Sequence, residues 1–283
     1  MKRNDSEPNE TRPGSPKGKL PMNKQPHRRK MRGLERHQYI IDYLKTHKSV
    51  DVSFLSAELA VSEVTVRKDL EKLEQDKWLV RSHGGAVLNE NLFVEPSFVE
   101  KEDKLTGEKS AIAAEAAKLI RDGMVVAMST GTTVSRLAGL IRDRTSLTVV
   151  TNAVNVATEL MGHAGIELFL TGGHIRPNTF ALIGETAEKS LDGVYTEYVF
   201  FGANGFSADE GLTTPSMEEA RVVRRLIDNA KHVVALVDHS KFGKAAFYRI
   251  VASGQVHTVI TDGKAPQDEV DKLRERGIQV ILA

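Results

Sequence analysis

One group of polar side chains in the first third of the chain has the residue types and spacing needed to read DNA. Arginine and lysine can hydrogen-bond guanine O6 and N7 or phosphate oxygens, and the methyl group of threonine can contact the methyl group of thymine. Four members fall at the start of one expected helix, and two more follow just before a glycine pair. The candidate DNA-binding residues are Ser62, Thr65, Arg67, Lys68, Arg81 and His83.

The elements around these residues predict a helix-turn-helix. Apolar residues recur at helical spacing from Leu34 onward, and residues 50–69 have the pattern of a helix, a turn and a second helix. Ser62 is a suitable N-cap for the second helix. The helical repeat predicts that one face packs inward, with Val64, Val66 and Leu70, and that the opposite face is exposed, with Thr65, Lys68 and Asp69. A three-helix bundle with an ordinary charged face is the alternative.

The residues behind this helix predict a wing. The sequence "WLVRSHGGAVL", residues 78–88, consists of two short extended runs around Gly84 and Gly85, which is a hairpin signal. A hairpin at this position would bring Arg81 and His83 beside the DNA groove, where they could contact phosphate or the minor groove. A local turn hydrogen bond is the alternative role for His83.

A second group of side chains could bind an anion. The sequence "MSTGTT", residues 128–133, follows an expected strand and opens an expected helix, whose free N–H groups attract phosphate. Other polar residues and glycines fall at the ends of later strands, where parallel sheets bind ligands. The candidate effector-binding residues are Gly131, Thr132, Thr133, Asn152, Gly172, Gly173 and Lys241. Helix capping and tight turns are the alternative roles for the threonines and glycines.

Several further residues are weaker candidates or bear on catalysis. Residues 202–205 and Asp238 also follow strands, and Glu219 and Arg221 lie on a later helix. No pair of carboxylates is evident beside Lys241 that would transfer a proton. We therefore expect no catalytic residues and no enzyme.

The chain divides into four segments by composition. Residues 1–31 form a basic tail with little that could be buried, and we expect it to be disordered. Residues 32–88 form the helical and hairpin domain, and residues 89–107 are polar and predict a linker. Residues 108–283 alternate helices with short apolar strands, which predicts an α/β domain with a mostly parallel sheet.

Composition also excludes several classes of protein. The chain contains no cysteine, which rules out disulfides and thiolate zinc sites. Its nine histidines form no HExxH pattern, so we expect no metal. No GxGxxG arrangement points to a dinucleotide, and we expect no cofactor. There is neither an apolar run of the ~18 residues that a membrane span needs nor a secretory signal, which favours the cytoplasm.

The charge is unevenly distributed along the chain, although its net value is only +1. Residues 1–33 contain ten lysines and arginines and three acids, while residues 34–88 contain eight against nine. A basic segment attached to a weakly acidic body suggests a polyanionic partner near the N-terminus, although a solvated tail without function has the same composition.

Together these motifs resemble those of the DeoR-type repressors of bacterial sugar metabolism. The resemblance rests on "VSEVTVRKDLEKLE" and "RSHGGA", followed in order by "STGTT", "VVTNA", "LTGG", "GANG" and "DHSKFG". It implies a winged DNA-binding domain and a C-terminal sensor related to ribose-5-phosphate isomerase, with phosphorylated sugars as effectors. The family usually has Asp where this chain has Ser129.

The leading hypothesis is a transcriptional regulator that represses a sugar-utilisation operon and is released by a phosphorylated sugar. Its partners would be double-stranded operator DNA, the sugar phosphate and a second copy of the chain, since operators usually demand at least a dimer. The alternatives are an enzyme of the sugar-phosphate isomerase type with a DNA-binding appendage and a nucleotide-responsive regulator.

Overall fold

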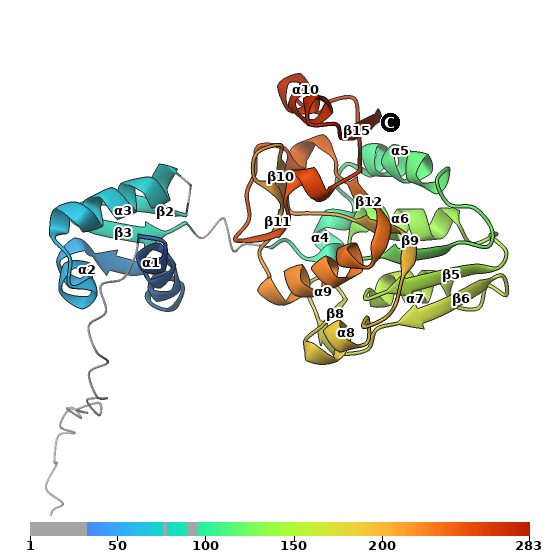
Figure 1. The fold of residues 1–283 in the computed structure, drawn as a ribbon, viewed down its shortest axis with the longest axis horizontal. Helices are drawn as coiled ribbons and strands as arrows, with labels where there is room; N and C mark the ends of the chain where they lie inside the picture. The colour runs from blue at the N-terminus through green and yellow to red at the C-terminus, as the bar shows by residue number, and fades with distance from the viewer. Residues whose placement is uncertain (1–32, 76–77, 90–94) are drawn as a thin grey trace, which may run out of the picture. The chain divides into compact units, whose positions relative to one another are not determined.

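The computed structural model describes residues 33–75, 78–89 and 95–283, which form two compact units (Figure 1). The smaller unit is centred on residues 33–73 and 81–87, and the larger unit is formed by residues 95–283; the described residues between these ranges, which cluster with the larger unit, continue the helix and strands of the smaller one. The expected tail, residues 1–31, lies outside the described residues. Within the described part of the chain, no helix combines the length and apolar character needed to cross a membrane.

The smaller unit is a winged helix-turn-helix, as predicted. Its elements are α1 (Gly33–His47), β1 (Ser49–Asp51), α2 (Val52–Leu59), α3 (Glu63–Gln75), β2 (Leu79–Ser82) and β3 (Gly85–Leu88). The apolar faces of the helices meet in one core, in which Ile40, Leu44, Leu55, Val66 and Leu70 are completely buried. The three strands form a sheet in the order β1-β3-β2, so the wing hairpin is joined to the strand that precedes α2.

The glycine pair of the wing has two separate structural roles. Gly84 has φ of +92°, a backbone conformation that L side chains rarely adopt, and it completes the turn of the hairpin. Gly85 lies opposite Asp51 in the ladder between β1 and β3, and a Cβ atom there would be 2.1 Å from the carbonyl oxygen of Val50. The first glycine therefore provides the turn, and the second allows the two strands to approach.

The larger unit is built on a seven-stranded sheet in which every pair of neighbouring strands is parallel. The strand order is β15-β14-β12-β9-β4-β5-β6. In chain order these strands are β4 (Val125–Met128), β5 (Leu147–Thr151), β6 (Ile166–Leu170), β9 (Thr196–Phe201), β12 (Ala230–Leu236), β14 (Thr258–Thr261) and β15 (Gln279–Leu282). The fold class expected for this half of the chain is thus confirmed.

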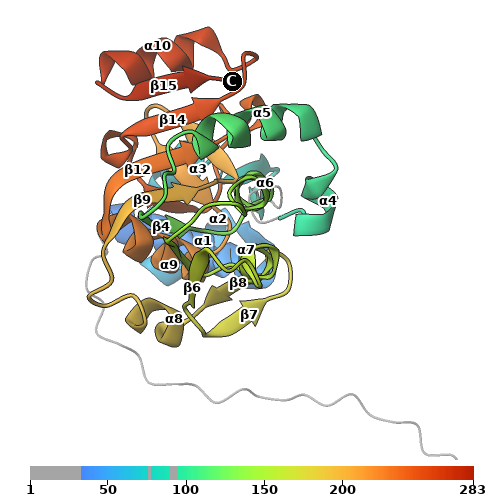
Figure 2. The same ribbon diagram turned by 90° about the vertical axis from the view of Figure 1, so that its right-hand side faces the viewer.

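Helices cover both faces of this sheet (Figure 2). One hydrophobic core lies under α5 (Thr106–Ala117), α6 (Thr132–Leu140) and α7 (Val154–Leu160). The other lies under α8 (Glu185–Lys189), α9 (Met217–Asp228) and α10 (Gln267–Glu275). The strand order reverses between β4 and β9, because β5 and β6 follow on one side and β12, β14 and β15 on the other. Such a switch point leaves a crevice at the carboxyl ends of the central strands, where ligands bind.

Smaller elements surround that crevice. A second sheet contains β10 (Gly205–Ser207), β11 (Gly211–Thr214) and β13 (Tyr248–Val251). The hairpin of β7 (His174–Arg176) and β8 (Ala181–Ile183) lies beyond β6, and two 3-10 turns, η2 (His239–Lys241) and η3 (Ser253–Gln255), follow β12 and β13.

The segment before the sheet differs from the linker expected at residues 89–107. Residues 98–102 form α4 (Phe98–Glu102), which begins with a capping box between Ser97 and Glu100, and α5 begins at Thr106. Phe98 is buried, and its N–H donates to the carbonyl of Asn178 at 2.7 Å. Residues 95–107 therefore belong structurally to the α/β unit. The polar composition of this segment is typical of a linker, because the packing of the short helix depends on a single buried aromatic side chain, that of Phe98.

Candidate functional site

The start of α3 presents a polar surface built around its N-cap. The backbone N–H of Thr65 donates to Ser62 Oγ at 3.2 Å, and the two hydroxyl oxygens are 2.9 Å apart. This cap fixes the first turn of the helix. Arg67 and Lys68 are exposed on the next turn, with the guanidinium of Arg67 3.4 Å from the carboxylate of Glu63. A solvent-screened pair of this kind is weak, so the guanidinium can exchange it for a phosphate or base.

The exposed face of α3 differs from the predicted face at two positions. Val64, expected to pack inward, is 64% exposed, while Asp69, expected outside, is buried. Asp69 accepts two hydrogen bonds from Arg36 on α1, at 2.7 and 3.0 Å, and lies 3.0 Å from Nε2 of His37. The hydrogen bonds that Arg36 donates to Asp69 also raise the pKa of Arg36. Asp69 therefore fixes α3 against α1, and Val64 joins the exposed surface.

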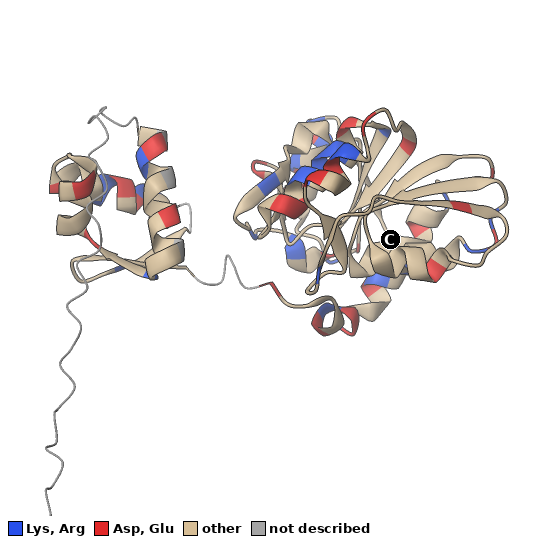
Figure 3. Ribbon diagram, turned by 90° about the horizontal axis from the view of Figure 1, so that it is seen from below, with Lys and Arg blue, Asp and Glu red and all other residues tan. Residues whose placement is uncertain are grey.

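The wing adds two of the predicted residues. His83 is exposed in the turn of the hairpin, and Arg81 is half-buried on β2. Figure 3 shows acidic and basic residues interspersed along the helices of this domain. Attraction to a phosphate backbone therefore has to come from individual cations such as Arg67 and Lys68.

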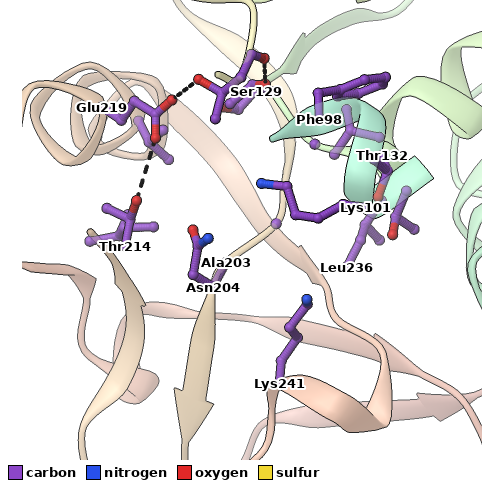
Figure 4. A pocket seen from close by; sticks show the side chains of 18 of the residues that line it. Phe98, Lys101, Ser129, Thr132, Ala203, Asn204, Thr214, Glu219, Leu236 and Lys241 are labelled. Atoms are coloured by element: carbon purple, nitrogen blue, oxygen red, sulfur yellow. Dashed lines mark hydrogen bonds between the residues drawn. The ribbon is translucent and has the colours of Figure 1, made fainter. Parts of the chain in front are cut away.

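In the larger unit a pocket opens at the switch point of the sheet. Its walls come from the carboxyl ends of β4, β9 and β12, the start of α6, and α4 and α9 (Figure 4). The polar lining residues are Glu95, Lys101, Ser129, Thr130, Thr132, Thr133, Thr179, Asn204, Thr214, Glu219, Asp238 and Lys241.

One side of the pocket is suited to an anion. Gly131 precedes α6 with φ of +142°, and Thr132 and Thr133 form the first helical turn, whose backbone N–H groups and dipole attract negative charge. The ammonium groups of Lys101 and Lys241 extend towards the middle of the cavity (Figure 4). Ser129 is buried, and its hydroxyl has no hydrogen-bond partner among the described residues. A ligand oxygen could satisfy it.

The other side carries hydrogen-bond acceptors. Glu219 is 4% exposed and accepts a hydrogen bond from the hydroxyl of Thr179 and another, at 3.4 Å, from that of Thr214. Burial, together with the nearby charge of Glu95, raises the pKa of Glu219. Arg176 links the two carboxylates, donating to Glu95 and lying 3.5 Å from Glu219.

Burial also changes the pKa values of two lysines around the pocket. Burial lowers the pKa of Lys241, and the neighbouring carboxylate of Asp238 partly opposes this. Behind the cavity, Lys109 on α5 is 3% exposed and donates to the backbone carbonyl of Lys101. Burial lowers the pKa of Lys109 to about 8. Desolvation thus disfavours the charged form of Lys241, and an anionic ligand beside it would favour that form.

The structure brings together four of the seven predicted effector residues. Gly131, Thr132, Thr133 and Lys241 line the pocket, whereas Asn152, Gly172 and Gly173 do not. The Asn152 side chain is fully buried and donates to the carbonyl of Leu182 at 3.3 Å. A Cβ atom on Gly173 would lie 2.6 Å from the carbonyl oxygen of Ile183. Asn152 and Gly173 are therefore occupied in holding the β7–β8 hairpin.

The pocket also contains residues that the sequence analysis did not select. They include Glu95, Phe98 and Lys101, which come from the expected linker. Of the weaker candidates, residues 202–204, Glu219 and Asp238 line the pocket, whereas Arg221 does not. Glu95 and Glu219 line the same cavity as Lys241, but the carboxylate that acts on the Lys241 ammonium group is that of Asp238.

Both halves of the chain match models of one protein family. Residues 36–91 match the DeoR-like helix-turn-helix domain, and residues 104–263, more than half of the chain, match the DeoR C terminal sensor domain. The chain belongs to the DeoR family. The resemblance carried by the sequence motifs is thereby confirmed.

Curated relatives match this DeoR-family chain over most of their length. A putative aga operon transcriptional repressor of Escherichia coli O157:H7 is 36% identical over 250 residues, which cover 88% of this chain and 93% of the relative. The HTH-type transcriptional repressor GlcR of Bacillus subtilis is 33% identical, with coverage of 88% and 95%. The glycerol-3-phosphate regulon repressor of Escherichia coli K12 is 31% identical, with coverage of 89% and 100%. This DeoR-family chain is a DNA-binding transcriptional regulator.

Solved structures give a weaker match. A D-ribose-5-phosphate isomerase in complex with phospho-erythronic acid aligns over 47% of this chain and 52% of its own, with 19% identity and a TM-score of 0.36. This similarity is too low to carry an argument, so the expected relationship of the sensor to that isomerase stays a prediction.

Proposed function

We propose that this regulator represses a sugar-utilisation operon and leaves its operator when a phosphorylated sugar occupies the pocket at the switch point. The observation that carries the proposal is the division of the pocket into two sides. Lys101, Lys241 and the start of α6 face the cavity on one side, and Glu219 and Asn204 face it on the other.

This division matches the chemistry of a sugar phosphate. A phosphate group carries negative charge and several acceptor oxygens, which suit a helix N-terminus and ammonium groups. The hydroxyl groups of a sugar donate and accept hydrogen bonds, which suit a carboxylate and an amide. The name of one relative supports a phosphorylated ligand, since that protein is the repressor of a glycerol-3-phosphate regulon.

On the DNA side, we assign the roles within the winged helix-turn-helix as follows. Arg67 and Lys68 contact base edges or phosphates from the exposed turn of α3, and Thr65 lies beside them. Ser62 fixes the start of that helix through its cap, and Arg81 and His83 contact the backbone from the wing. The regulator acts in the cytoplasm as at least a dimer, because operators are usually read by two domains.

An isomerase activity is the second candidate, and one observation favours it. Glu219 is a buried carboxylate with a raised pKa in the same cavity as Lys241, which is a suitable setting for proton transfer. We propose that the chain is not an enzyme, because the relatives that match it over most of their length bear the names of regulators.

Fluorescence anisotropy tests the proposal with labelled DNA from upstream of the chain's own gene. We expect ribose 5-phosphate, fructose 6-phosphate, galactose 6-phosphate or glycerol 3-phosphate to lower the DNA affinity about five- to 150-fold, the usual range for allosteric coupling. The variant Lys241→Met should lose this response and keep DNA binding, while Lys244→Met, an exposed lysine outside the pocket lining, should behave like the wild type.

The same mixtures are assayed for isomerised product. Release of DNA without turnover supports the regulator, and turnover at an enzyme-like rate supports the second candidate. If no phosphorylated sugar changes the DNA affinity, the proposed effector class is wrong.

A further inference from the structure

Three residues that line the pocket come from a segment that neither family match includes. Glu95, Phe98 and Lys101 line the cavity, but the matches cover residues 36–91 and 104–263. The segment 95–102 is also the first part of the α/β unit after the wing, since only six residues separate Leu88, the end of β3, from Glu95. Any ligand contact with this segment is therefore close, along the chain, to the DNA-binding domain.

Glu95 is the most densely bonded residue of this segment. Its side chain is 2% exposed and accepts a hydrogen bond from Arg176. Asn204 Nδ2 donates to Glu95 Oε1 at 3.4 Å, and Lys101 Nζ lies 3.7 Å from the same oxygen. Asn178 donates to the backbone carbonyl of Glu95 at 3.2 Å. The chain is thus anchored inside the pocket at the point where it enters the α/β unit.

A second anchor lies one helical turn further on. The ring of Phe98 contacts that of Phe180, with centroids 5.4 Å apart, and its N–H is bonded to Asn178. Both partners belong to the loop between β7 and β8. The start of α4 is consequently held by packing, while Glu95 is held by charge and hydrogen bonds.

The groups that hold Glu95 are also groups that a sugar phosphate would use. Lys101 is a cation facing the cavity, and Asn204 is an amide in its lining. An anionic ligand beside Lys101 competes with Glu95 for that ammonium group, and ligand hydroxyls compete for Asn204. Ligand binding and the anchoring of Glu95 are therefore linked, because they use the same partners. A ligand can shift a protein between two conformations only if it contacts them differently, and these shared partners provide such a difference.

We propose that the segment 95–102 is part of the effector site and is the element through which the effector controls the DNA-binding domain. Without a ligand, Glu95 anchors this segment in the pocket. When a sugar phosphate binds against Lys101 and Asn204, the anchor weakens and the segment 95–102 shifts. This inference rests on the proposed function, because it uses the same pocket and the same class of ligand.

The variant Glu95→Gln tests the proposal in the full-length chain. It keeps the size of the side chain but removes the negative charge held by Arg176 and Lys101. The measured quantity is the coupling factor, the ratio of DNA affinities without and with the sugar phosphate that acts most strongly on the wild type. We expect a wild-type factor of at least about ten to fall to about two or less. Glu275→Gln, the same change at an exposed position of α10 outside the pocket lining, should keep the wild-type factor.

Hydrogen exchange on the wild type gives a readout that does not depend on a variant. We expect the sugar phosphate to change exchange in peptides from residues 95–103 as well as in those from residues 129–135. A ligand effect confined to residues 129–135, or a Glu95→Gln variant with the wild-type coupling factor, overturns the coupling role while the proposed function stands. A wild type whose DNA affinity responds to no sugar phosphate overturns the proposed function instead.

Discussion

Replacing Asp69 by Asn is the most direct test of how α3, the proposed recognition helix, is held against α1. The Asp69 carboxylate accepts two hydrogen bonds from Arg36 and lies beside His37, and the side chains of all three residues are between 10% and 15% exposed. Asn has the same shape but no charge, and it has one acceptor oxygen in place of two. The substitution therefore leaves the guanidinium of Arg36 partly buried without its counter-ion.

The size of the effect follows from this geometry. Hydrogen bonds to charged groups contribute about 1.5–3 kcal/mol, and breaking a fully buried ion pair by removing one partner costs about 3–5 kcal/mol. Because Arg36 and Asp69 retain some solvent contact, we expect a loss of about 2–3 kcal/mol in the stability of α3 against α1. At about 1.4 kcal/mol for each factor of ten, the opening of α3 should become roughly 30- to 150-fold more frequent.

Hydrogen exchange of the full-length chain measures that opening in peptides from α3. Glu71→Gln provides the matched control, since Glu71 is an exposed acid on the same helix. We expect faster exchange in α3 and weaker operator binding for Asp69→Asn, and wild-type behaviour for the control. Equal exchange in α3 for both variants would show that the ion pair does not hold the recognition helix.

Three further predictions concern single positions. Gly85→Ala should lower the stability of the winged domain by about 3 kcal/mol, because the added Cβ would overlap a β1 carbonyl. Gly107→Ala is the control, since its Cβ would meet open space. Equal thermal unfolding and equal operator binding for the two variants would contradict the prediction. Burial lowers the pKa of Lys109 to about 8 from an ordinary 10.5, so the folded chain binds fewer protons than the unfolded chain between these values. The free energy of unfolding should then rise by up to about 3 kcal/mol as the pH increases through that window, and the Lys109→Met variant should lack this rise. Urea unfolding at several pH values measures it, and the prediction fails if the wild type and the variant depend on pH in the same way. Arg67→Ala and Lys68→Ala should each weaken operator binding by about 1–3 kcal/mol with circular dichroism unchanged, and the helix assignment fails if gel shifts detect no loss for either.

The winged domain was predictable because its signals are local. The Ser62 cap acts on an N–H three residues away, and the two glycines lie within the turn and the strand that they shape. The orientation of α3 was only partly predictable. Helical spacing alone could not decide whether Asp69 lies inside, because its partner Arg36 is 33 residues away in the sequence.

The candidate site was half predictable for a related reason. Placing ligand residues at the carboxyl ends of strands selected the α6 start and Lys241, which line the pocket at the switch point. It also selected Asn152, Gly172 and Gly173, which follow β5 and β6 on one side of the sheet. The order of the strands in the sheet decides which strand ends border the pocket, and that order depends on pairings between segments that are distant in the sequence. Glu95 was missed because a polar stretch before the first strand has the composition of a linker.

The position of β3 at the centre of its small sheet determines how a pull on the chain would act. The chain leaves the winged domain from the end of β3, which is paired with β1 on one side and with β2 on the other. Tension along β3 would load both ladders in shear, so that many hydrogen bonds resist together, whereas an edge strand would peel away one bond at a time. The N–H of Val52, at the start of α2, donates to the carbonyl of Gly84 beside this ladder at 2.9 Å. We therefore expect a pull along β3 to reach the helix-turn-helix through these bonds before the wing unravels.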